Sequence, residues 1–139
     1  MPLRRVFVVM CADLFHCGHV AFLKQCKGLY DDVFLIVGLR DDETMATYKR
    51  RPIMTLEERR IVVEACRYVD CVVTHVPLSL TTDYLTRHAI DIVVHGDGIS
   101  TEEVRQKYGV AVDLGKYLHV PRTPGISTTA ILARMRYRP

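Results

Sequence analysis

Two histidines flank a glycine where the sequence changes from an apolar run to a helical pattern. His16 and His19 enclose Gly18, the apolar run covers residues 6–10, and the helical pattern covers residues 20–29. The first N–H groups of a helix have no partner within it, so they attract an anion that lies beside the helix start. Gly18 lets a ligand approach the backbone, and an imidazole can donate to charge that develops on a phosphoryl oxygen. The spacing suits a phosphate site, and it equally suits histidines that only cap the helix or lie on the surface.

The same segment raises the alternative of a metal site, because Cys11, His16, Cys17 and His19 are all potential ligands. Structural zinc sites usually draw on two separated pairs of ligands at recognisable spacing, and no second pair follows here. We therefore expect no metal held by protein side chains. The five cysteines are odd in number and form no Cys-X-X-Cys motif, which favours reduced thiols over a disulfide framework.

Length and composition predict one globular domain over residues 1–139. With 49% hydrophobic and 25% charged residues, the chain can bury one core and is too short for two ordinary domains. No apolar run approaches the ~20 residues that span a bilayer, and no signal-peptide pattern is present, so we expect a cytoplasmic protein. The net charge of +3 does not indicate a nucleic-acid partner and is compatible with an anionic small molecule.

Short β-branched runs alternate with helical patterns along nearly the whole chain, which indicates an α/β fold with a parallel sheet. Strands are expected over residues 6–10, 33–38, 71–75, 91–95 and 117–120, and helices over residues 20–29, 55–66, 82–88, 100–109 and 128–135. Right-handed crossovers then give a doubly wound, Rossmann-like five-stranded sheet. Ligands of such sheets bind at the carboxyl ends of the strands, and the two histidines follow the first strand at such an end.

A second polar segment near the other end of the chain has groups that can hold a phosphate. Arg122 can grip a phosphate with two parallel hydrogen bonds, Gly125 loosens the turn, and Ser127 is a candidate N-cap for a helix that Thr128 begins. An ordinary capped helix after a proline-bounded turn is the alternative. Residues 45–52 are polar, basic and poorly periodic, and they predict a mobile loop that carries Lys49.

Taken together, these segments resemble a known family. Residues 13–19, Asp-Leu-Phe-His-Cys-Gly-His, and residues 122–129, Arg-Thr-Pro-Gly-Ile-Ser-Thr-Thr, look like the two signatures of the CTP-dependent cytidylyltransferases of lipid and teichoic-acid synthesis. Glu58-Arg59 and residues 66–70 also match the family pattern. The resemblance extends from about residue 6 to residue 135. It implies transfer of CMP from CTP to a phosphorylated alcohol with release of pyrophosphate, on the nucleotidyltransferase fold that carries a His-X-Gly-His motif.

The resemblance also implies roles for individual residues. His16 and His19 would contact the CTP phosphates, Lys49 would reach the α-phosphate and the acceptor phosphate, and Arg122 would hold the phosphates that leave. Further nucleotide-binding positions would be Gly18, Arg67, Asp97, Thr123, Gly125, Ile126, Ser127 and Thr128, and acceptor-binding positions would be Asp13 and Tyr68. Mg²⁺ would arrive bound to the triphosphate. Similar proteins pair as homodimers, so a homodimer is expected.

Three positions depart from the family pattern: Met10, Ala12 and Gly98 stand where a glycine, an aromatic residue and an aspartate are usual. They leave open a nucleotide-binding regulator without turnover, and an adenylyltransferase of the same superfamily. Ethanolamine phosphate is the favoured acceptor, ahead of choline phosphate and glycerol 3-phosphate. The chain has no tryptophan, and an aromatic cage is the best site for a quaternary ammonium.

Overall fold

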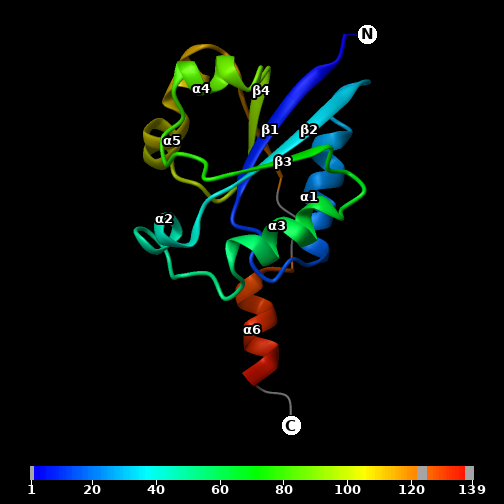
Figure 1. Cartoon of the computed structure of the whole chain (residues 1–139), viewed down its shortest axis with the longest axis vertical. Helices are drawn as coiled ribbons and strands as arrows, with labels where there is room; N and C mark the ends of the chain where they lie inside the picture. The colour runs from blue at the N-terminus through cyan, green and yellow to red at the C-terminus, as the bar shows by residue number, and fades with distance from the viewer. Residues whose placement is uncertain (1, 122–124, 137–139) are drawn as a thin grey trace.

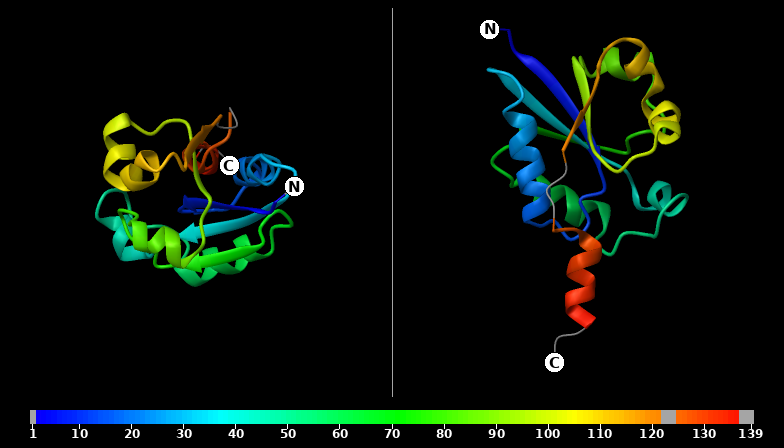
Figure 2. Two further views of the ribbon diagram at one scale, coloured as in Figure 1. Left: turned by 90° about the horizontal axis from the view of Figure 1, so that it is seen from above. Right: turned by 180° about the vertical axis from the view of Figure 1, so that it is seen from behind.

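Five parallel strands form the centre of the molecule, in the order β3-β2-β1-β4-β5. We describe a computed structural model of the chain over residues 2–121 and 125–136. Figure 1 shows the sheet with helices on either side, and Figure 2 gives the views from above and behind. The elements in chain order are β1 (Arg4–Met10), α1 (Cys17–Lys27), β2 (Val33–Leu39), α2 (Asp42–Ala46), α3 (Leu56–Glu64), β3 (Cys71–Thr74), α4 (Thr82–Arg87), β4 (Ile92–Gly96), α5 (Thr101–Asp113), β5 (Tyr117–Val120) and α6 (Thr128–Arg136). The predicted doubly wound, Rossmann-like sheet is confirmed.

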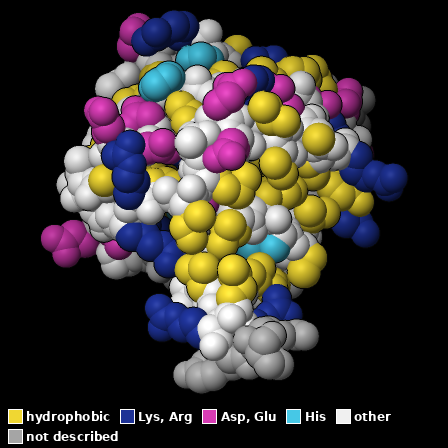
Figure 3. Space-filling view, turned by 60° about the horizontal axis from the view of Figure 1, so that its bottom comes forward, with side chains coloured by type: hydrophobic (Ala, Val, Ile, Leu, Met, Phe, Trp, Pro, Cys, Tyr) yellow, Lys and Arg dark blue, Asp and Glu magenta, His cyan; other side chains and the backbone are white. Residues whose placement is uncertain are grey.

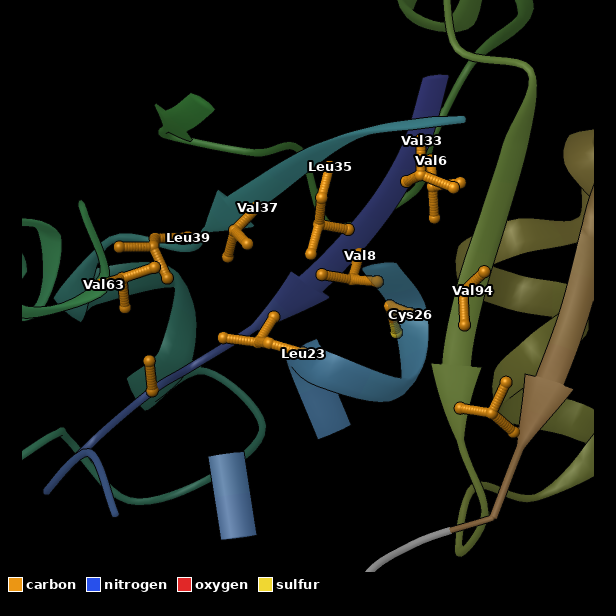
Figure 4. Packing of buried hydrophobic residues seen from close by; sticks show 12 residues of the cluster. Val6, Val8, Leu23, Cys26, Val33, Leu35, Val37, Leu39, Val63 and Val94 are labelled. Carbon is orange, nitrogen blue, oxygen red and sulfur yellow. The ribbon is translucent and has the colours of Figure 1, made fainter. Parts of the chain in front are cut away.

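Alternate residues of β1 pack against helices on opposite faces of the sheet, because successive side chains of a strand point to opposite sides. Val6 and Val8 belong to a core with Leu23 of α1 and Val63 of α3, and Figure 4 labels these side chains. Phe7 belongs to a second core that α4 and α5 cover. Both faces are apolar, which explains why the strands read as nearly continuous hydrophobic runs.

Two helices differ from the prediction. Helix α5 continues to Asp113 rather than ending near Gly109, because Tyr108 and Ala111 are fully buried in the second core and their burial outweighs the helix-weakening effect of one glycine. The short helix α2 occupies the start of the predicted mobile loop. Asp41 is its N-cap and accepts a hydrogen bond from the amide of Thr44 at 2.6 Å, and Met45 is buried.

Helix α6 extends away from the body of the molecule (Figure 1), and none of its described residues is buried. Its first turn contacts the loop after β1. There the hydroxyl of Thr128 donates to the carbonyl oxygen of Asp13 at 3.1 Å. The two polar segments of the sequence therefore meet at the carboxyl end of β1. Within the described ranges, no helix combines the length and hydropathy needed to cross a membrane.

Candidate active site

A cavity of about 730 Å³ lies at the carboxyl ends of β1 and β4. The connections from these neighbouring strands leave toward opposite faces of the sheet, which is where a doubly wound fold opens a crevice. The lining combines the loop after β1, the start of α1, the segment around α2, the end of β4, the side of α5 and the start of α6. Figure 3 looks toward this end of the molecule and shows a histidine among hydrophobic side chains, with lysine and arginine side chains around them.

His16 and His19 form the cap of α1 and line the cavity at the same time. The amide of Gly18 donates to Nδ1 of His16 at 3.0 Å, and the amide of His16 donates to Nδ1 of His19 at 3.0 Å. Histidines thus make a reciprocal capping box, a role that serine and glutamate usually fill. The two rings lie with their centroids 3.9 Å apart. Because each Nδ1 is an acceptor, the neutral form of each ring carries its proton on Nε2 and can donate it to a ligand.

Both imidazoles are held in the neutral form. Burial lowers the pKa of His19 to about 4, with a further contribution from the neighbouring His16. Burial also lowers the pKa of His16. The caps reinforce this, because a protonated ring has no free lone pair on Nδ1 to accept an amide hydrogen bond. The pair therefore offers two neutral N–H donors beside the N-terminus of α1.

The depressed pKa of His19 predicts a loss of stability in acid. The unfolded chain protonates this residue near pH ~6.5, whereas the folded protein resists protonation down to about pH 4. The stability that the neutral ring provides is therefore complete above pH ~6.5 and is lost as the pH falls from there toward 4. Between pH 7.5 and 5, the free energy of unfolding of the wild type should fall by about 1 to 2 kcal/mol more than that of His19→Asn.

Urea denaturation of wild type and variant at the two pH values measures the difference. His119→Asn, a change at an exposed histidine of β5, is the control and should keep the wild-type acid dependence. An acid dependence that is identical in wild type and His19→Asn would contradict the assignment.

Gly18 lies where no side chain fits. A Cβ atom there would come within 2.8 Å of both Cε1 of His16 and Cγ2 of Ile126. The residue therefore allows the cap of α1 and the segment before α6 to approach each other. Ser127 then caps the first turn of α6, since its hydroxyl accepts from the amide of Ala130 at 3.0 Å. Residues 126–129 line the cavity together with the histidines.

Asp13 is buried and lines the cavity. Its carboxylate oxygens accept hydrogen bonds from the amides of Ile53 and Met54, each at 2.9 Å. The adjacent residues Ala12 and Leu14 have φ values of 60° and 49°, so the loop turns sharply on both sides of this carboxylate. Asp13 thus ties the loop after β1 to the segment that leads into α3.

Arg59 of α3 is fully buried and binds four groups from three segments of the same region. Its guanidinium donates to the carbonyl oxygens of Cys11, Arg40 and Met54 at 2.9, 3.0 and 3.2 Å. It also contacts the carboxylate of Asp42 at 2.6 Å. Arg59, which matches the family pattern in sequence, thus holds together the loops that build the cavity.

The structure brings together most, but not all, of the predicted site residues. Lys49 and Asp97 line the cavity with the histidines. Arg67 and Tyr68 do not: they follow the end of α3 and line a separate shallow hollow with Phe15 and Val20. Gly125 has a φ of 80°, as its predicted role in a turn requires, but does not line the cavity. Arg122 and Thr123 lie outside the described residues.

Two of the departures from the family pattern have local structural reasons. Gly98 adopts a φ of 95°, a conformation that an aspartate rarely takes, so the loop after β4 is built for glycine here. Ala12 is buried at a left-handed position, where a small side chain is accommodated with the least strain. Met10 lines the cavity directly.

Sequence reasoning assigned no role in the site to four basic residues of the cavity: Arg40, Arg50, His95 and Lys107. Arg50 is the neighbour of Lys49 on the segment after α2. Arg40 directly follows β2, so the rule that placed the histidines at a strand end could have found it. His95 lies near the carboxyl end of β4, where the same rule applies. Lys107 has no such signal, because a lysine within α5 looks like any solvated helix charge.

Comparison with known proteins relates this chain to one family. The family model "Cytidylyltransferase-like" matches residues 8–134. Choline-phosphate cytidylyltransferase A of Mus musculus is 39% identical over 132 residues, which are 94% of this chain and 36% of that protein. The probable ethanolamine-phosphate cytidylyltransferase of Schizosaccharomyces pombe is 38% identical, with the same two coverages. Ethanolamine-phosphate cytidylyltransferase of Mus musculus is 39% identical, over 94% of this chain and 32% of that protein.

The chain thus spans about a third of the length of the curated relatives it matches. Among solved structures, the lipopolysaccharide core biosynthesis protein of Thermoplasma volcanium superposes with a TM-score of 0.67 at 22% identity. That match covers 86% of this chain and 96% of the other. At this identity, the match supports the fold alone.

Proposed function

The chain belongs to the cytidylyltransferase-like family, and on that premise we propose that it transfers CMP from CTP to a phosphorylated alcohol. One observation carries the proposal. Two neutral histidines present Nε2–H donors beside the N-terminus of α1, in a cavity that Lys49 and the start of α6 also line. Fixed donors of this kind stabilise the negative charge that develops when a phosphoryl bond breaks.

In the proposed reaction, an oxygen of the acceptor phosphate attacks the α-phosphorus of CTP. A new P–O bond forms there, and the bond to the β-phosphate breaks and leaves its electron pair on pyrophosphate. The chain mainly positions the reactants and stabilises charge. His16 and His19 donate to phosphate oxygens of CTP, the hydroxyls of Ser127 and Thr128 lie nearby at the start of α6, and Lys49 is the cation that spans the two substrates.

Magnesium is proposed to enter with the triphosphate. Among residues 2–121 and 125–136, no group of three or more histidine, cysteine, aspartate or glutamate side chains is placed to hold a metal ion. Phosphate oxygens are ligands that Mg²⁺ prefers in nucleotide-dependent enzymes.

Ethanolamine phosphate is the acceptor we propose. The relatives named for choline and for ethanolamine match this chain at the same 38–39% identity, so the choice of acceptor rests on the chemistry of the pocket. Tyr48 lines the cavity, but Nζ of Lys107 lies 4.0 Å from its ring centroid, so that ring is not open to a quaternary ammonium. The carboxylates of Asp13, Asp97 and Glu103 line the cavity and suit a primary ammonium. The family resemblance further supports a cytoplasmic homodimer that serves phospholipid synthesis.

The test is a panel in which pyrophosphate is measured. The protein is incubated with Mg²⁺, with CTP or ATP, and with ethanolamine phosphate, choline phosphate or glycerol 3-phosphate. We expect pyrophosphate from CTP with ethanolamine phosphate as the best acceptor. Turnover with ATP alone would favour an adenylyltransferase, and CTP binding without pyrophosphate from any acceptor would favour a regulator.

A further inference from the structure

Three cations surround the ring of Tyr48 on the side of the cavity that faces α5. Nζ of Lys107 lies 4.0 Å from the ring centroid, the guanidinium carbon of Arg40 lies 5.7 Å away, and Nζ of Lys49 lies 5.9 Å away. All three side chains line the cavity. They come from the carboxyl end of β2, the segment after α2, and α5, so the fold gathers positive charge from three parts of the chain at one place.

Arg40 is 5% exposed and forms no ion pair with a carboxylate of the described residues. Its Nη1 donates to the hydroxyl of Tyr48 at 2.9 Å, and its Nη2 donates to the carbonyl oxygen of Leu78 at 3.2 Å. Its Nε is buried and has no hydrogen-bond partner in the described part of the chain. A buried charge without a counter-charge is costly, so an anion bound beside Arg40 would be stabilised.

Lys107 is 7% exposed and only partly compensated. Its partner Glu103 lies 3.3 Å away and is itself half exposed. Burial lowers the pKa of Lys107, and the charges of Arg40 and Lys49 lower it further, against the hydrogen bond to Glu103. Holding several cations this close is unfavourable unless a negatively charged ligand joins them.

We propose that Arg40 and Lys107 form an anion subsite for the acceptor substrate, separate from the phosphate site at His16 and His19. The inference rests on the proposed function, because it needs two anionic substrates in one cavity. The histidines and the start of α6 hold the phosphates of the nucleotide, and the α5 side holds an anionic group of the acceptor. That group is the acceptor's phosphate or a carboxylate further along the same molecule.

This subsite also governs which acceptors bind. An ammonium group is repelled from Arg40 and Lys107, so it must point toward the carboxylates at the other parts of the lining, Asp13 and Asp97. In an acceptor that carries a carboxylate as well as a phosphate, both anionic groups are attracted to these two cations. Arg40 and Lys107 are therefore specificity residues for the acceptor and leave the binding of CTP unchanged.

The experiment measures KM for each substrate in wild type, Arg40→Gln and Lys107→Met. We expect each variant to raise the acceptor KM at least tenfold while the KM for CTP stays within threefold. Arg40→Lys, which keeps the charge, should recover part of the loss. Arg87→Gln removes an exposed arginine of α4 that is 67% exposed in its side chain and lies outside the cavity lining, and it should leave both constants unchanged.

Two acceptors that differ by one carboxylate, ethanolamine phosphate and O-phosphoserine, identify the anion. If both substitutions weaken ethanolamine phosphate, the subsite holds the phosphate, and if they weaken only O-phosphoserine, it holds the carboxylate. An acceptor KM that stays at the wild-type value for both compounds in Lys107→Met and Arg40→Gln would overturn the proposal. Thermal unfolding of the variants identifies any effect that comes from misfolding of Arg40→Gln.

Calorimetric binding separates this inference from the proposed function. Each acceptor is titrated into protein saturated with α,β-methylene-CTP, which cannot release pyrophosphate. Binding that depends on Arg40 and Lys107 in a protein without turnover would leave the subsite standing and remove the proposed activity. Normal turnover, with acceptor binding that neither substitution alters, would support the proposed activity and reject the subsite.

Discussion

His19→Ala lowers kcat at least 100-fold and leaves the fold intact, if the histidine pair stabilises the departing pyrophosphate. The removed Nε2–H is one of two neutral donors fixed by backbone amides at 3.0 Å. Loss of one preorganised donor to a developing oxyanion typically costs about 10²–10³ in rate. The effect should fall on kcat more than on the KM for CTP, because the charge develops in the transition state.

The same loss is expected for His16→Ala, together with a small loss of stability, because that side chain is also the N-cap of α1. Cys17→Ser is the matched control. It lies between the two histidines, is exposed and does not line the cavity, so its kcat should stay near the wild-type value. Steady-state kinetics with CTP and ethanolamine phosphate measures all three variants. Survival of activity in both alanine variants would place the site elsewhere.

Arg59→Met destabilises the protein by about 3 to 5 kcal/mol, because it removes the fully buried partner of an ion pair and leaves several carbonyl oxygens without their donor. The carbonyl oxygens of Cys11, Arg40 and Met54 each lose a donor, and Asp42 loses its partner. Acceptor and nucleotide binding should weaken as well, since these carbonyls belong to the loops that line or adjoin the cavity.

The neighbouring residue supplies the control for this prediction. Arg60 lies one position along α3, where its side chain is 32% exposed and pairs with Glu57 and Glu64 on the surface. Surface pairs contribute little, so Arg60→Met should change the free energy of unfolding by less than about 1 kcal/mol. Urea denaturation compares the two variants. Equal, small effects would show that Arg59 does not hold the loops together.

Local patterns predict the parallel sheet and the edge where ligands bind, and the family resemblance predicts that the two polar segments contribute to one site. Apolar runs identify buried strands, and polar residues that follow them identify the edge where ligands bind. His16, Asp97 and Ser127 therefore come together as expected. The expectation that residues 45–52 form only a loop is wrong at its start, where Asp41 caps a short helix that has no periodic apolar face.

The remaining features depend on packing between distant elements. Arg59 follows a capping box like that of an exposed helix, and only the fold shows that its guanidinium reaches the ends of β1 and β2. Lys107 becomes a cavity residue because α5 runs beside Tyr48. Tyr68 and Arg67 match the family pattern in sequence, yet the end of α3 directs them to another hollow. These contacts depend on how distant elements pack, so the sequence pattern around each residue does not predict them.

The most direct test of the proposed function follows the label of CTP in two parallel reactions. CTP labelled at the α-phosphorus and CTP labelled at the γ-phosphorus are each incubated with the protein, Mg²⁺ and ethanolamine phosphate, and the products are separated by chromatography. Cleavage between the α- and β-phosphates places the α-label in CDP-ethanolamine and the γ-label in pyrophosphate, in equal amounts. Appearance of the α-label in free CMP alone, or of the γ-label in inorganic phosphate, would contradict CMP transfer to the acceptor.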